Sequence, residues 1–154
     1  LVHSKFIIQL KKNTLMKILF IILSTLFFAK GCSNQINIEE VEIQYVAETR
    51  GYYYSIKIED KNFYVINARN DKPKEVHLSK NEWNVLSKLF NEIDLTTFEK
   101  LIGETNERDF DKRPFGNLFI TKNDKKIQTK GFDHTIPPRE IKPFIDLILQ
   151  YSKK

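Results

Sequence analysis

The sequence predicts an α+β domain, in which an antiparallel sheet of about five strands carries two main helices on one face. Three observations lead to this prediction. Period-two alternation marks a run of three strands and, later, a pair of strands. Two other segments have apolar residues at helical spacing. These helices are too few to connect every strand to the next by a crossover, so the sheet is expected to be antiparallel.

A leader precedes this domain. Met16, the only methionine, is followed by Lys17 and then by an apolar run over 18–29. A helix of that length rises about 18 Å, which is short of the roughly 30 Å hydrocarbon core of a bilayer. Residues 16–31 are therefore predicted to be a signal peptide, and residues 1–15 to be a spurious upstream extension.

The leader ends at the only cysteine. Gly31 directly precedes Cys32, and polar residues follow. This arrangement resembles the bacterial lipobox, in which the cysteine sulfur is acylated and becomes the new N-terminus. The resemblance implies a lipid anchor at Cys32, a polar tether over 32–38, and a domain over 39–154. The expected location is the cell envelope, anchored to the outer membrane, with the domain in the periplasm or at the cell surface. An ordinary signal peptide, cleaved or not, is the alternative.

The charge distribution argues against binding of nucleic acid. The chain has 25 basic and 20 acidic residues, but five of the lysines precede Cys32, where no acidic residue occurs. The remaining domain therefore carries 20 charges of each sign. A domain with zero net charge lacks the basic footprint that phosphate recognition needs.

The first three strands are predicted as a meander. Residues 41–48 alternate between apolar and polar, and two further strands cover 52–58 and 63–67. The turns between them hold Arg50-Gly51 and Asp60-Lys61. Strands connected this closely pair antiparallel.

Two helical segments follow. Ser79 and Glu82 form a capping box, and Leu78 and Trp83 are spaced as a hydrophobic staple. An apolar stripe follows at helical spacing: Trp83, Leu86, Leu89, Phe90 and Ile93. We expect this helix to bury Trp83 against the sheet. Residues 96–99 repeat the box for a shorter helical turn that ends near Gly103.

A second hairpin and a closing helix complete the domain. Strands over 117–122 and 126–130 are joined by a turn at Asn123-Asp124. The closing helix begins near Arg139, which puts Pro143 in the first turn, where its missing N–H costs least. Lys142 and Asp146 are spaced to pair on the outer side of this helix.

The loops that enter and leave the second hairpin are expected to meet at its open end. Four charged residues and one histidine on these loops are the candidate binding residues: Arg108, Asp111, Asp133, His134 and Arg139. In one interpretation Asp133 pairs with Arg108 or with backbone and fixes a loop before Pro137-Pro138. In the other, the cluster binds a ligand or performs acid–base chemistry. No catalytic residue is assigned.

Tyr53 is a further candidate binding residue. In the run 52–54 it points away from Tyr52 and Tyr54, and an exposed ring there would suit a sugar or a peptide. No metal or cofactor is expected, because His77 and His134 are far apart in sequence and show no ligand motif. Cys32 is the only thiol, which excludes disulfides and thiolate catalysis in the domain.

Several short motifs together resemble small lipoproteins of unassigned activity from Bacteroidetes-type bacteria. They are Tyr45, Arg50-Gly51-Tyr52, Ser79 with Trp83, Ile93-Asp94-Leu95, Arg108 with Asp111, Lys130-Gly131-Phe132-Asp133-His134 and Pro137-Pro138. Where these relatives tend to carry Gly-Ala after the aspartate, this chain has Lys112-Arg113. The resemblance covers most of 41–150 and implies a single α+β domain in the envelope, but no reaction.

The leading hypothesis is a monomeric, lipid-anchored and non-catalytic module that binds an envelope protein or a glycan. One alternative is a small hydrolase that uses Arg108, Asp133 and His134. The other is an inhibitor of an envelope protease.

Overall fold

The structure is a computed structural model and describes residues 36–110 and 112–154. The expected signal peptide, Cys32 and Asp111 lie outside the described residues. The domain includes residues 36–38, which were expected in the tether. Asn37 caps a short 3-10 helix, η1 (Ile38–Glu40), and Ile38 is buried in the core. The last residues of the expected tether therefore belong to the domain, because their isoleucines contribute to its apolar interior.

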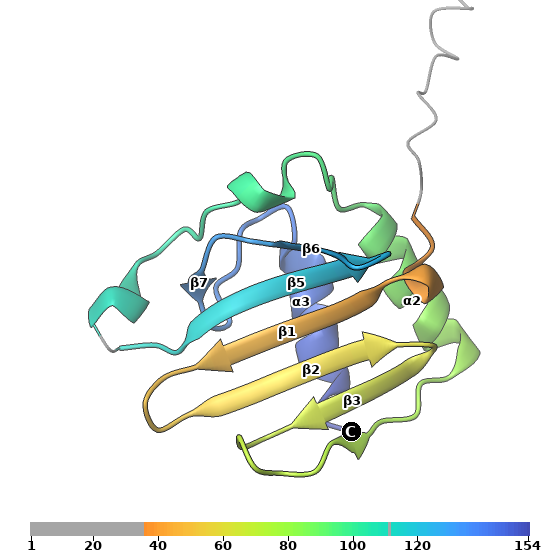
Figure 1. Cartoon of the computed structure of the whole chain (residues 1–154), viewed down its shortest axis with the longest axis horizontal. Coiled ribbons are helices and arrows are strands. Elements are labelled where there is room, and N and C mark those ends of the chain that lie inside the picture. Colours follow the sequence, from red (N-terminus) through yellow and green to blue (C-terminus); the bar gives the residue numbers. More distant parts are fainter. Residues whose placement is uncertain (1–35, 111) are drawn as a thin grey trace, which may run out of the picture. The chain divides into compact units, whose positions relative to one another are not determined.

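The domain is built on one open antiparallel sheet with the order β4-β3-β2-β1-β5-β6, and β7 pairs with β5 (Figure 1). The strands are β1 (Glu42–Glu48), β2 (Tyr53–Glu59), β3 (Asn62–Ile66), β4 (Lys74–Glu75), β5 (Phe115–Lys122), β6 (Lys125–Gln128) and β7 (Phe132–Asp133). The predicted meander and hairpin are confirmed, and the antiparallel pairing of β1 with β5 joins them. The sheet has seven strands because two-residue strands, too short to show alternation, extend it.

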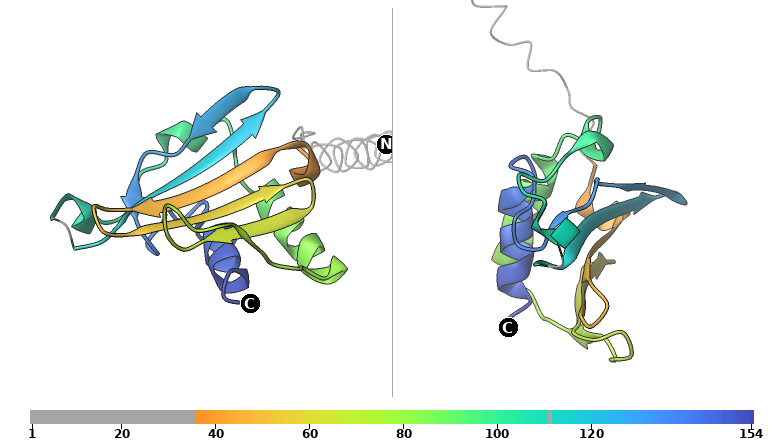
Figure 2. Two further views of the ribbon diagram at one scale, coloured as in Figure 1. Left: turned by 60° about the horizontal axis from the view of Figure 1, so that its bottom comes forward. Right: turned by 90° about the vertical axis from the view of Figure 1, so that its left-hand side faces the viewer.

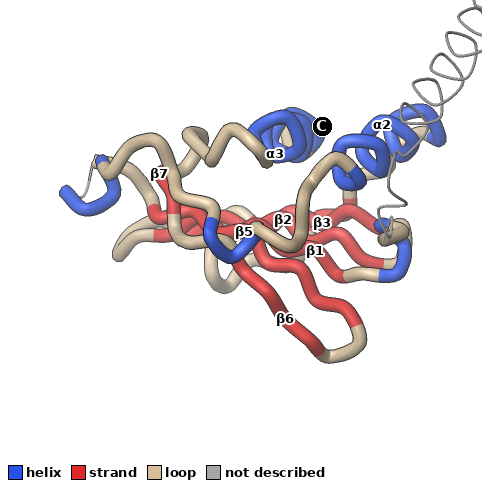
Figure 3. Tube along the Cα trace, turned by 90° about the horizontal axis from the view of Figure 1, so that it is seen from above, coloured by secondary structure: helices blue, strands red, loops and turns tan. Residues whose placement is uncertain are grey.

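Both helices cover the same face of the sheet, as Figures 2 and 3 show. They are α2 (Lys80–Asn91) and α3 (Lys142–Tyr151). The inward residues of β1, with the inward positions of β2 and β5, meet the apolar sides of these helices. Fully buried residues at this interface include Tyr45, Leu86, Leu118, Phe144 and Ile148. Within the described part of the chain, neither helix has the length and apolar character that crossing a bilayer requires.

The helix ends show which local predictions hold. The capping box of α2 is present, since Ser79 Oγ accepts from Glu82 N and Glu82 Oε2 accepts from Ser79 N. Trp83 is only partly buried, although it packs on the core. The prediction of a second capping box at 96–99 is wrong. Asp94 accepts hydrogen bonds from the N–H and the hydroxyl of Thr96, and a short 3-10 helix, η2 (Phe98–Lys100), follows. A carboxylate two residues ahead accepts these hydrogen bonds, so no box forms at 96–99.

The closing helix begins later than predicted. Helix α3 begins at Lys142, not near Arg139, but Pro143 does lie in its first turn. The ion pair between Lys142 and Asp146 is present, with Nζ to Oδ2 at 2.8 Å. Residues 138–141 form tight turns, in which Ile141 N donates to Pro138 O.

Candidate functional site

Three loops meet at the end of the sheet where β1 ends and β5 begins (Figure 1). They are residues 49–52, residues 103–114 without Asp111, and residues 133–138, and we call them the loop end. The middle loop contains a third 3-10 helix, η3 (Glu107–Phe110). Hydrogen bonds tie loop 49–52 to His134 and the middle loop to Asp133.

Asp133 fixes the middle loop. Its carboxylate is fully buried and accepts from Thr105 Oγ1, from Glu107 N at 2.8 Å and from Arg108 N at 2.9 Å. Arg108 also donates through its guanidinium, with Nη1 at 3.1 Å. Burial alone would raise the pKa of Asp133, but these hydrogen bonds outweigh it and lower the pKa to about 2. The carboxylate is therefore charged at neutral pH and committed to loop 105–108.

His134 faces away from this network, into a group of tyrosines. Tyr45 Oη lies 2.6 Å from His134 Nδ1, and Tyr52 Oη lies 3.4 Å from Nε2. The His134 ring stacks on Tyr45 with centroids 5.9 Å apart, and Tyr54 is also within 6.1 Å. Burial, followed by the positive charge of Arg113, lowers the pKa of His134, so the imidazole is neutral at pH 7.

The hydrogen bonds of Tyr45 indicate which nitrogen of His134 carries the proton. Tyr45 is fully buried, and His134 Nδ1 is the only hydrogen-bond partner of its hydroxyl among the described residues, so the hydroxyl proton goes to His134. Tyr45 Oη then donates to Nδ1, and the neutral ring carries its proton on Nε2. Nε2–H is thus the group that points toward Tyr52, which forms the exposed edge of the site.

The turn that presents His134 is strained. Ile136 N donates to Asp133 O at 2.8 Å, which closes a tight turn. Thr135, at its third position, has a φ of 72°, in the left-handed region that a β-branched residue rarely adopts. Such conformations cost on the order of 1–3 kcal/mol and persist only where the surroundings fix them. Here two buried residues fix the turn: Asp133 before Thr135 and Pro137 after it.

Large apolar side chains are exposed around this centre. Tyr52 is 39% exposed, Phe115 is 42% exposed and Phe110 is 73% exposed. The Phe115 ring lies over Gly131, where a Cβ atom would come within 1.8 Å of Phe115 Cζ, and 5.8 Å from the Arg108 guanidinium carbon. Exposed aromatic residues beside arginines are typical of the centres of protein–protein interfaces.

The predicted site residues are thus only partly brought together. Arg108 and Asp133 form the expected ion pair, and His134 lies next to them in the turn but bonds elsewhere. Arg139 pairs with Glu104 at the surface. Tyr53 is partly exposed on the face of the sheet opposite the helices, where the Arg69 guanidinium carbon lies 5.3 Å from its ring centroid.

Most aromatic residues of the loop end could not be predicted from the sequence. Phe110 lies in a loop rich in charge and Phe115 directly follows that loop, and single apolar residues in such a segment carry no periodic signal. Gly131 was the available clue to Phe115, since a glycine in a strand-like segment often marks a close approach. Tyr45 was predicted as part of the strand 41–48 and was one of the short motifs of the resemblance, but nothing placed it beside His134.

Comparison of the chain with protein-family models finds no match, and comparisons with curated proteins and with solved structures find no similar protein. Among residues 36–110 and 112–154, no three histidine, cysteine, aspartate or glutamate side chains are grouped so that they could hold a metal ion.

Proposed function

We propose that this chain is a lipid-anchored, non-catalytic module of the bacterial cell envelope that binds a protein partner through its loop end. The observation that carries the binding role is the exposure of Tyr52, Phe110 and Phe115 at the loop end, beside the loop 105–108 that hydrogen bonds to Asp133 hold in place. Exposed aromatic side chains cost solubility, and a rigid frame reduces the entropy lost on binding. The leader before Cys32 supports the envelope location.

The loop end is better suited to binding than to hydrolysis. Asp133 accepts four hydrogen bonds and has no exposed surface, so it does not orient His134 as a general base. His134 already accepts at Nδ1, and its remaining polar group is a donor. A protein backbone carbonyl is a natural partner for such a donor beside aromatic rings. The hydrolase alternative would need the opposite tautomer of His134.

Site-specific photo-crosslinking in the native bacterium tests the proposal. A photoreactive phenylalanine analogue replaces Phe110, and a matched chain carries it at Val85, which is 47% exposed on α2. The proposal predicts one discrete protein adduct at position 110, none at position 85, and loss of the adduct when Phe115→Ser is added. Equal labelling from both positions, or an adduct that survives Phe115→Ser, would contradict binding at the loop end.

An envelope protease inhibitor is one special case of this proposal. In that case the adduct at position 110 is a protease, and the purified protein inhibits it. If the adduct is an envelope protein without proteolytic activity, the inhibitor alternative is wrong and the binding role stands.

A further inference from the structure

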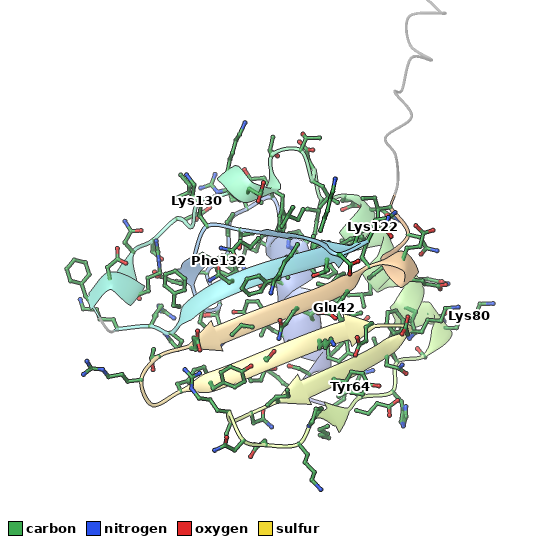
Figure 4. All side chains as sticks on the ribbon, in the orientation of Figure 1. Glu42, Tyr64, Lys80, Lys122, Lys130 and Phe132 are labelled. Carbon is green, nitrogen blue, oxygen red and sulfur yellow. The ribbon has the colours of Figure 1, made fainter. Side chains whose placement is uncertain are left out.

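An apolar pocket lies at the opposite end of the sheet from the loop end. It has a volume of about 280 Å³, and its lining is mostly aliphatic, contributed by Ile36, Val41, Leu95, Ile120 and Ile127. Lys122, Asn123 and Lys125, from the β5–β6 turn, line the rest. Figure 4 shows Lys122 at the end of β5 beside the start of β1.

The pocket is built into the fold. Val41 and Ile120 are buried core residues, while Ile36, Leu95 and Ile127 pack partly against that core. The turn between Lys122 and Lys125 is a tight one, with Asn123 at φ 48° and Asp124 at φ 62°, the pairing that two-residue hairpins favour. This turn holds both lysines beside the aliphatic lining.

The two lysines give the pocket a charged side. Lys122 Nζ donates to Glu40 Oε2 at 2.9 Å, and both side chains are partly exposed. Lys125 is exposed and forms no ion pair with any residue in 36–110 or 112–154. An aliphatic lining with an unpaired ammonium group is complementary to an aliphatic chain that ends in an anion.

We propose that this pocket binds a free fatty carboxylate of medium chain length, with its carboxylate on Lys125 and Lys122 and its chain against Ile36, Leu95 and Ile127. The volume limits the chain. A water molecule takes about 30 Å³ in the liquid, and a methylene group is of similar size, so the cavity holds roughly nine carbons. This inference does not depend on acylation of Cys32 or on the loop end.

Chain length gives the first test. The full chain in phosphatidylcholine nanodiscs is photolabelled with a decanoate that carries a terminal diazirine, and unlabelled carboxylates compete at known free concentrations. Each buried methylene raises affinity about fourfold. Competition should therefore strengthen by about fourfold per carbon up to decanoate and then level off. A steady increase through tetradecanoate, or labelling spread over peptides remote from 36–41, 95 and 118–128, would contradict a pocket of this size.

The lysines give the second test. Lys122→Gln with Lys125→Gln should lower decanoate affinity about threefold to tenfold, as expected for exposed charge-assisted contacts. Lys74→Gln with Lys88→Gln removes two exposed positive charges elsewhere and should have no effect. If decanol competes as well as decanoate, or if both double variants behave alike, the carboxylate assignment is wrong.

A pocket-filling variant separates binding from folding. Ile127→Phe places a larger side chain in the partly buried β6 position and should abolish labelling while thermal unfolding stays near that of the parent chain. Val85→Phe, on exposed α2 surface, is the matched control and should label normally. Full labelling of Ile127→Phe would overturn the proposal.

Discussion

At the scale of single residues, the segment 133–135 combines three different tasks. Asp133 fixes loop 105–108, His134 presents a donor to the half-exposed edge, and Thr135 adopts a strained φ that connects them. Adjacent side chains on such a turn point in different directions. This explains why Asp133 and His134, although neighbours in the chain, have different hydrogen-bond partners.

Asp133→Asn tests whether the carboxylate stabilises the fold. The variant removes the buried counter-charge of the Arg108 guanidinium, whose side chain is only 11% exposed, and leaves only the exposed carboxylate of Asp109, 3.9 Å from Nε. We expect a loss of about 3 kcal/mol in the free energy of unfolding at pH 7. Chemical denaturation of the variant and the parent measures this loss.

The difference in free energy of unfolding between the parent and Asp133→Asn should depend on pH, because the pKa of Asp133 is lowered in the folded state. Its folded pKa of about 2 is below the value near 3.9 of an unfolded aspartate. The unfolded state therefore binds the proton first, and the stabilisation is complete above about pH 5 and is lost progressively as the pH falls through 2. The difference in free energy of unfolding between the parent and the variant should therefore become smaller over that pH interval. A gap that is constant from pH 7 to pH 2 would show that the charge contributes nothing.

At the scale of elements, local signals and long-range contacts differ in how well the sequence reveals them. The capping box of α2 lies within four residues and was predicted correctly. The box at 96–99 was wrong because Asp94, just outside the motif, competes for the same donors. The side-by-side pairing of β1 and β5 joins segments about 70 residues apart, so no local pattern specifies it.

Ser79→Ala tests the contribution of the cap. It removes the side-chain acceptor for Glu82 N, and we expect the free energy of unfolding to fall by about 1 kcal/mol. Ser87→Ala in the interior of the same helix is the control, and it should leave stability unchanged or raise it slightly. Equal destabilisation by both substitutions would show that the cap is not the cause.

At the scale of the whole molecule, the sheet separates two features. The loop end carries the exposed aromatic residues, and the opposite end carries the apolar pocket and the start of the described chain. The sequence predicted the α+β class and the loops that carry Arg108 and Asp133. It did not predict the pocket, whose lining comes from three separate segments that only the fold brings together.

Membrane anchoring through Cys32 is the part of the proposed function on which the envelope location depends. Intact mass and detergent partitioning of the protein from its native membrane test this anchor, with Cys32→Ala as the comparison. We predict a mass that corresponds to a chain beginning at an acylated Cys32, and release of the variant into the aqueous phase. A wild-type chain that retains Met16, or a Cys32→Ala chain that partitions unchanged, would contradict the anchor.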